Sequence, residues 1–167
     1  MIHRLPAPLH VAGLRLAHAV RRRWWWLRWR LLGRTVRGCR VLVFDSEERL
    51  LLIRHSYGKP HWTLPGGGIG RGEDILAAAA REVHEECACR LIEVMALGEG
   101  DDVADGLHQV HLVAGWTCDT AMADGREIVA ARFFALTELP EPLSEKLAAR
   151  LPGYLTRAKA ARAVRLG

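Results

Sequence analysis

The chain has 167 residues, of which 50% are hydrophobic and 26% are charged, and it contains four cysteines. This length suits one domain with a sizeable hydrophobic core, and the composition excludes a disordered chain. The cysteines, at positions 39, 87, 89 and 118, form no CxxC pair and no zinc-ligand spacing, which indicates a reduced, cytoplasmic protein without a structural metal. Because arginines interrupt the first apolar run, we expect neither a signal peptide nor a membrane-spanning helix.

Charge is strongly segregated along the chain. Residues 1–40 hold ten arginines and no acidic residue, and residues 146–167 hold six basic residues and no acidic one. All 19 acidic residues lie between these ends, where they outnumber eight basic residues. The net charge of +5 therefore conceals an acidic centre between two basic ends, and each needs its own functional explanation.

A basic helix is predicted over residues 9–32, which contain no proline. At about 100° per residue, one apolar stripe of this helix contains Leu16, Val20, Trp24, Leu27 and Leu31. The opposite side carries Arg15, Arg22, Trp25, Trp26 and Trp29. We therefore divide the chain into a basic, Arg/Trp-rich N-terminal helix, residues 1–35, and a domain formed by residues 36–167.

Three roles fit this N-terminal helix. Tryptophan and arginine side chains combine apolar surface with polar tips, which suits packing against the domain itself or against a second subunit in a homodimer. The same composition suits peripheral contact with an anionic membrane surface, and such contact would add membrane association to a cytoplasmic location. Nucleic-acid binding is the least favoured role, because no recognition motif accompanies the charge.

The remaining chain alternates between predicted strands and helices. Residues 39–44 and 50–53 form apolar strands around a polar turn, which indicates a hairpin, and residues 62–64 form a short segment before a glycine-rich loop. A helix is predicted over residues 73–87, with an inward face of Leu76, Ala79, Ala80, Val83 and Cys87. Further strands are predicted over residues 91–97, 110–116 and 128–136, and two C-terminal helices over residues 145–150 and 154–164.

Three carboxylates crowd one face of the predicted helix over residues 73–87. Glu82, Glu85 and Glu86 stand at positions i, i+3 and i+4, where like charges repel by a few tenths of a kcal/mol per pair. Taken alone, such a cluster favours an ordinary solvated helix face. A glycine-rich loop leads into this helix, however, and an oxygen-rich cluster is what a hard divalent cation stabilises, so the context favours a metal site.

The glycine-rich loop contains Gly66, Gly67, Gly68, Gly70 and Gly72. Its spacing matches neither a P-loop nor a dinucleotide-binding fingerprint. Arg81 can pair with Glu73 at the start of the helix or with a neighbouring carboxylate. Such a pair is either a surface ion pair of little energetic weight or a link that fixes the loop and directs the carboxylates.

Gly67, Glu73 and the run Arg81-Glu82-Val83-His84-Glu85-Glu86-Cys87-Ala88-Cys89 together resemble the signature of the Nudix hydrolases, in particular MutT-like bacterial members. Every charged position of that signature is occupied at the right spacing. Two positions depart from it: Ala88 stands where the family usually has glycine, and Gly70 stands where relatives often have an acid. Similarity outside the signature extends the resemblance over residues 36–139, through residues 54–57, 62–67 and 127–134.

The resemblance implies an α/β fold, an α/β/α sandwich with a mixed β-sheet, to which the N-terminal helix is added. It also implies a metal-dependent hydrolase that cleaves the pyrophosphate linkage of a nucleoside diphosphate linked to another moiety. Mg²⁺, or alternatively Mn²⁺, would be held by Glu82, Glu85, Glu86 and the Gly67 carbonyl. Glu86 is the first candidate for the general base and Glu127 the second, with Asp101 and Asp102 more distant candidates, and Arg81 and Glu73 support them.

Substrate contacts are expected from Gly66, Gly67 and Gly68, and from Arg54, Tyr57 and Trp62. Stacking of Tyr57 or Trp62 on a base competes with the simpler interpretation that these rings belong to the core. No secondary motif selects the leaving group, so the substrate is a nucleoside triphosphate or a nucleotide-sugar. The alternative function is a membrane-surface or nucleic-acid-binding module with a degenerate or secondary hydrolase site.

Overall fold

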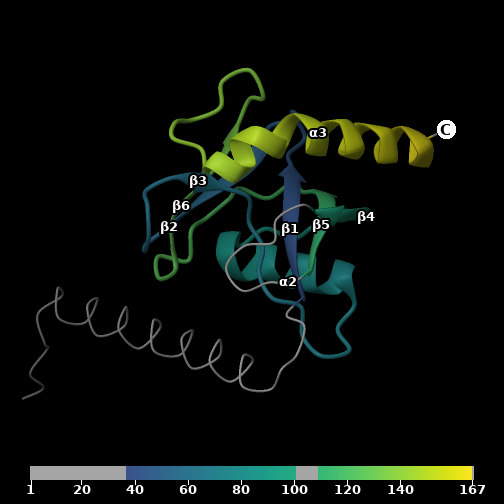
Figure 1. The fold of residues 1–167 in the computed structure, drawn as a ribbon, viewed down its shortest axis with the longest axis horizontal. Coiled ribbons are helices and arrows are strands. Elements are labelled where there is room, and N and C mark those ends of the chain that lie inside the picture. Colours follow the sequence, from purple (N-terminus) through teal and green to yellow (C-terminus); the bar gives the residue numbers. More distant parts are fainter. Residues whose placement is uncertain (1–36, 101–108, 167) are drawn as a thin grey trace, which may run out of the picture. The chain divides into compact units, whose positions relative to one another are not determined.

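The computed structural model describes residues 37–100 and 109–166. In chain order the elements are β1 (Arg37–Phe44), β2 (Leu50–His55), β3 (Trp62–Thr63), α2 (Ile75–Cys87), β4 (Glu93–Gly100), β5 (Gln109–Trp116), β6 (Ile128–Phe134) and α3 (Glu145–Leu166) (Figure 1). The predicted N-terminal helix, Asp101 and Asp102 lie outside the described residues. In the described parts of the chain, no helix combines the length and apolar character needed to cross a membrane.

The six strands form one mixed sheet around β1. Strand β1 runs parallel to β5 along its full length, from the pair Arg37 and Gln109 to the pair Phe44 and Trp116, and β4 pairs antiparallel with β5. A hairpin joins β1 to β2, which pairs antiparallel with both β3 and β6. The sheet order is β3-β2-β1-β5-β4, with β6 on β2, so the predicted mixed sheet is confirmed.

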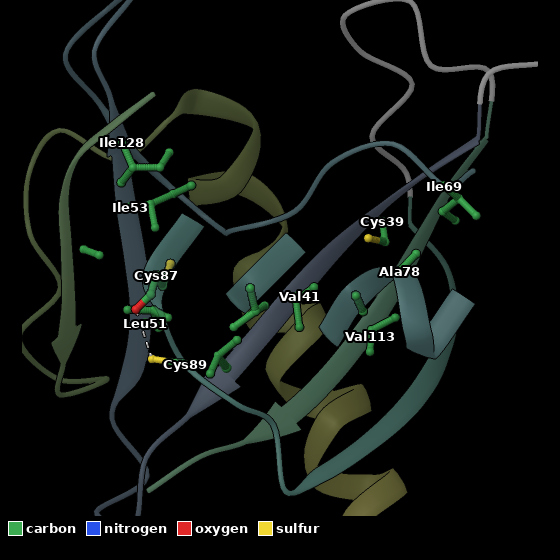
Figure 2. Packing of buried hydrophobic residues seen from close by; sticks show 14 residues of the cluster. Cys39, Val41, Leu51, Ile53, Ile69, Ala78, Cys87, Cys89, Val113 and Ile128 are labelled. Atoms are coloured by element: carbon green, nitrogen blue, oxygen red, sulfur yellow. Dashed lines mark hydrogen bonds between the residues drawn. The ribbon is translucent and has the colours of Figure 1, made fainter. Parts of the chain in front are cut away.

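A helix covers each face of the sheet, as Figure 1 shows. On one face, Val41, Val43 and Leu51 pack with the apolar residues of α2, and Figure 2 shows part of this cluster. On the other face, Leu42, Phe44, Leu50 and Leu52 pack with Leu147, Leu151, Tyr154 and Ala158 of α3. Because β1 and β2 are buried on both faces, their sequences are continuously apolar rather than alternating.

The two predicted C-terminal helices are one continuous helix, α3, so this prediction was wrong. Pro152 lies inside α3 and lacks the N–H that would complete a helical hydrogen bond. The buried residues Leu147, Leu151, Tyr154 and Ala158 nevertheless keep a helical spacing on both sides of this proline. Packing of this stripe on the sheet therefore offsets the local preference of the proline to end a helix.

Helix α2 begins two residues later than predicted. Asp74 is its N-cap, and the Asp74 carboxylate accepts hydrogen bonds from the backbone N–H of Leu76 at 2.9 Å and of Ala77 at 3.1 Å. Glu73 consequently precedes the helix, where its side chain is able to turn back toward the glycine-rich loop. At the other end, Ala88 is the C-cap and has a left-handed backbone with φ of 57°.

The conformation of Ala88 predicts a stabilising substitution. A left-handed backbone costs a non-glycine residue about 1–2 kcal/mol, so Ala88→Gly is expected to raise the free energy of unfolding by about 1 kcal/mol. Urea denaturation measures the change. The matched control is Ala160→Gly within α3, where the same chemical change should lower stability by about 1 kcal/mol. A loss of stability in both variants would contradict the prediction.

Candidate active site

Strand β1 positions the glycine-rich loop. The backbone N–H groups of Cys39 and Val41 donate to the carbonyls of Gly67 and Pro65, both at 2.9 Å, and the Ile69 N–H donates to Arg37 O at 2.9 Å. The loop therefore runs antiparallel to β1, with Gly38 opposite Gly68. These hydrogen bonds place the loop beside a buried strand, so its position is fixed by the sheet itself.

Two glycines of the loop are required by close approaches. Gly66 has φ of 143°, and a Cβ atom at this position would lie 2.3 Å from the Cys39 carbonyl oxygen of β1. At Gly67, a Cβ atom would lie 2.5 Å from the Glu82 carboxylate carbon. Glycine at these positions lets the loop contact β1 on one side and the Glu82 carboxylate of α2 on the other.

The Arg81 guanidinium joins the loop to α2. Its Nε donates to Glu73 Oε1 at 2.8 Å, and its Nη2 donates to the Gly68 carbonyl at 3.0 Å and to Glu73 Oε2 at 3.1 Å. Its Nη1 donates to Glu82 Oε1 at 2.8 Å and lies 3.4 Å from Glu85 Oε2. The predicted pairing of Arg81 with Glu73 and with neighbouring carboxylates is thus confirmed.

Glu73 completes this link. Its Oε2 accepts a hydrogen bond from the Gly70 N–H at 2.6 Å, so one carboxylate contacts both the loop and Arg81. The hydrogen bond from Arg81 holds the pKa of Glu73 below its ordinary value, and the same bond raises the pKa of Arg81. Both groups are therefore charged at neutral pH, and the loop is attached to the helix by an ion pair with several hydrogen bonds.

Glu82 and Glu86 are carboxylates withdrawn from water. Burial raises the pKa of Glu86 to about 8, although the Gly66 N–H donates to Glu86 Oε2 at 3.0 Å and opposes the shift. Burial also raises the pKa of Glu82 despite its hydrogen bond with Arg81. The negative charges of Glu82 and Glu127 raise the pKa of Glu86 further. A bound cation would offset both the desolvation of these carboxylates and their mutual repulsion.

These carboxylates do not form a closed cage as they stand. Within residues 37–100 and 109–166, no group of three or more His, Cys, Asp or Glu side chains is arranged to hold a metal ion. The side chain of Glu85 is 59% exposed and turns toward Arg81, whereas that of Glu82 is 15% exposed. The oxygen-only donor set and the buried charge still fit a hard divalent cation, with Glu82 and Glu86 as the inner pair and Glu85 at the rim.

Among the more distant predicted residues, Glu127 and Tyr57 come together. The Tyr57 hydroxyl donates to Glu127 Oε1 at 2.6 Å, and the charge of Glu127 reaches both Glu82 and Glu86. Trp62, by contrast, is 8% exposed and packs edge-on against Phe134 in the cluster beneath α3. Glu127 thus interacts with Tyr57 by a hydrogen bond and with the α2 carboxylates through its charge, whereas the Trp62 ring lies in the core of the opposite face.

Arg54 lies beside Trp62. The two residues are paired across β2 and β3, and the Arg54 guanidinium carbon lies 5.6 Å from the centre of the Trp62 ring. This distance is typical of a cation–π contact. Arg54 is thus held near the end of β2, three residues before the exposed Tyr57.

Asp124 is a positioning residue that sequence reasoning missed. Its carboxylate accepts backbone N–H groups of Arg126 and Ile128, both at 2.8 Å, and of Glu127 at 3.3 Å. The sequence signal was present as Asp124-Gly125, a dipeptide typical of tight turns, and Gly125 has φ of 69°. The turn that Asp124 organises carries Glu127 into the start of β6.

The raised pKa of Glu86 predicts how stability depends on pH when no metal is bound. The pKa of Glu86 rises from 4.5, its ordinary value, to about 8 in the folded protein. The folded state then retains a proton that the unfolded state releases, so the free energy of unfolding falls as pH rises from about 5 to about 8. The slope from this group is at most about 1.4 kcal/mol per pH unit.

Urea denaturation in EDTA at several pH values in that interval checks this prediction. Glu86→Gln should have a shallower slope than the unmodified protein, because glutamine does not titrate. Glu138→Gln, which changes an exposed glutamate near the end of the sheet, is the matched control and should retain the slope. Equal slopes in the unmodified protein and Glu86→Gln would show that Glu86 does not carry the effect.

Comparison with known proteins agrees with this geometry. A family model described as NUDIX domain matches residues 34–156. A Mycobacterium tuberculosis protein named "Putative 8-oxo-dGTP diphosphatase 2" is 37% identical over 93 residues, covering 50% of this chain and 60% of that protein. A Caulobacter vibrioides RNA pyrophosphohydrolase is 37% identical over 62 residues, covering 36% of each protein. The chain thus spans 60% of the length of the first relative and 36% of the second, less than two thirds of either.

Solved structures share the fold. The MutT NUDIX hydrolase from Burkholderia pseudomallei superimposes with a TM-score of 0.54 at 26% identity, covering 71% of this chain and 97% of that one. A UDP-X diphosphatase superimposes with a TM-score of 0.64 at 21% identity, covering 77% of this chain and 64% of that one. The family model covers all six strands and the first half of α3, and the loop, Arg81 and the glutamates of α2 lie in one site. The chain therefore belongs to the Nudix hydrolase family.

Proposed function

We propose that the chain is a divalent-metal-dependent hydrolase that cleaves the pyrophosphate linkage of a nucleoside diphosphate linked to another moiety. The observation that carries this proposal is the pair of buried carboxylates, Glu82 and Glu86, facing a glycine-rich loop that Arg81 fixes to their helix. The names of the related proteins, which include an 8-oxo-dGTP diphosphatase and a UDP-X diphosphatase, support a nucleoside triphosphate or a nucleotide-sugar as the substrate.

The metal would be held by Glu82, Glu85, Glu86 and the Gly67 carbonyl. Glu82 already lies against Gly67, and the Gly67 carbonyl uses one hydrogen bond, from Cys39, which leaves a second lone pair on that oxygen. Bound Mg²⁺ or Mn²⁺ would supply the positive charge that neutralises the pyrophosphate and polarises its phosphorus–oxygen bonds. Glu85 would have to leave Arg81 to join this set, a change that its exposed position allows.

The chain's own residues would then handle the proton and the substrate. Glu86 is the first candidate to accept a proton from the attacking water, because the Gly66 N–H holds its carboxylate beside the glycine-rich loop, and a bound cation would keep that carboxylate unprotonated. Glu127 is the second candidate. Gly66, Gly67 and Gly68 allow a phosphate to approach the backbone closely. Tyr57, two residues beyond β2, lies beside Glu127, whereas Arg54 is held against Trp62, whose ring packs on the face opposite α2, so the predicted substrate contact of Arg54 is less well supported.

A substrate screen tests the proposal. Nucleoside triphosphates in canonical and oxidised form, nucleotide-sugars and dinucleotides would be incubated with Mg²⁺ or with Mn²⁺, and released phosphate or nucleoside monophosphate measured. We expect turnover of at least one compound, abolished by EDTA. A screen in which every compound stays intact with either metal would contradict the proposal.

Glu86→Gln is expected to reduce kcat by about a hundredfold or more, the range for loss of a general base. The fold should be retained, because the raised pKa already makes the neutral form of this side chain acceptable to its surroundings. Steady-state kinetics on the substrate found in the screen would measure the effect, with Glu138→Gln as the control. A folded Glu86→Gln protein with full kcat would remove Glu86 from the mechanism.

Gly67→Ala is a second test, directed at the geometry. The added methyl group would displace the Glu82 carboxylate, the flexible end of a side chain, so the domain should fold while activity falls by about a hundredfold. Gly153→Ala in α3 is the matched control, since nothing lies within 4 Å of its added Cβ. Kinetics and Mg²⁺-dependent thermal stability should change only in Gly67→Ala. Normal activity in this variant would show that Glu82 need not lie against Gly67.

A further inference from the structure

The backbone of Glu127 is held from two directions. From one side, the Asp124 carboxylate binds the N–H groups of the turn, and the Gly125 N–H donates to Ile128 O at 3.1 Å. From the other side, the Ser56 N–H donates to Glu127 O at 2.8 Å, just beyond the irregular pairing of β2 with β6 at Arg54 and His55. The Cα of Glu127 is therefore fixed, and only its side chain retains freedom.

Tyr57 restricts that remaining freedom. Its hydroxyl donates to Glu127 Oε1 at 2.6 Å, a short distance typical of a hydrogen bond to a charged carboxylate. The Tyr57 ring lies 5.0 Å from the His55 ring at 32°, a contact between two residues of the same segment. Although Tyr57 is 39% exposed, its ring is thus supported by His55 and its hydroxyl is directed at Glu127.

We propose that Tyr57 is a positioning residue, which holds the Glu127 carboxylate in place through its hydroxyl rather than stacking on a base of the substrate. This inference rests on the proposed function. One oxygen of Glu127 is engaged by the hydroxyl, which leaves the second oxygen to act on the reacting groups. The charge of Glu127 acts on Glu82 and Glu86, so without the hydroxyl its side chain would be free to turn away from them, because like charges repel.

The hydroxyl distinguishes positioning from stacking. Stacking on a base uses a ring face and makes no use of the hydroxyl, which here is directed at Glu127. A tyrosine that acted only by stacking would not need its hydroxyl. The presence of a directed 2.6 Å hydrogen bond, between residues 70 positions apart in the chain, therefore favours the positioning role.

A double-mutant cycle of Tyr57→Phe and Glu127→Gln tests this proposal on the full chain with the substrate identified in the screen. Tyr57→Phe keeps the ring, and we expect kcat to fall about tenfold with KM changed less than about twofold, the size of one lost charge-assisted hydrogen bond. In the Glu127→Gln background, Tyr57→Phe should produce no further loss, because the group it positions has already been altered. Tyr57→Leu, which removes the ring as well, should lose no more kcat than Tyr57→Phe.

Two results would overturn the proposal. One is unchanged kcat in Tyr57→Phe together with a raised KM in Tyr57→Leu, which would assign the ring to substrate binding. The other is multiplication of the separate losses in the double variant, which would make the two residues independent. A crystal structure of Tyr57→Phe supplies a readout that needs no activity: a displaced Glu127 carboxylate supports the proposal, and an unmoved one overturns it. A silent substrate screen would contradict the proposed function alone.

Discussion

The candidate site depends on one guanidinium group. Arg81 contacts the loop through Gly68, the start of the helix through Glu73, and two of the clustered carboxylates. Like charges at these spacings repel by a few tenths of a kcal/mol per pair, and the Arg81 guanidinium offsets this repulsion at Glu82 and Glu85. A surface ion pair would contribute little, but Arg81 forms five hydrogen bonds that join separate segments, and removing it would release the loop as well as the charge.

Strand β1 explains why the loop is rigid enough for this role. Its side chains are buried on both faces of the sheet, while its backbone binds β5 along one edge and the glycine-rich loop along the other. A strand fixed on all four sides has little freedom to move. The backbone hydrogen bonds from Cys39 and Val41 hold the loop against this strand. Gly66 permits the close approach to β1 that this pairing requires.

Local patterns were sufficient for much of this architecture. The apolar strands, the helix with its glutamates and the Arg81–Glu73 pair follow from spacings within about twenty residues of sequence. The continuity of α3 through Pro152 does not follow from local sequence, because the helix is kept intact by a buried stripe that packs on the sheet. The pairing of Tyr57 with Glu127 joins residues 70 positions apart, and no local pattern specifies it. Trp62 illustrates the same limit, since its position beside a strand fits the core as well as a substrate contact.

Burial of the carboxylates affects both the stability of the fold and the proposed binding of metal. Folding withdraws Glu82 and Glu86 from water, which raises the pKa of each, and Glu86 accordingly retains a proton at neutral pH when no metal is present. A divalent cation among these oxygens would favour their charged forms, so its binding must displace that proton and must strengthen as pH rises. Burial of these carboxylates therefore lowers the stability of the metal-free protein as pH rises. Over the same pH range it would strengthen the binding of a divalent cation to the glutamates of α2.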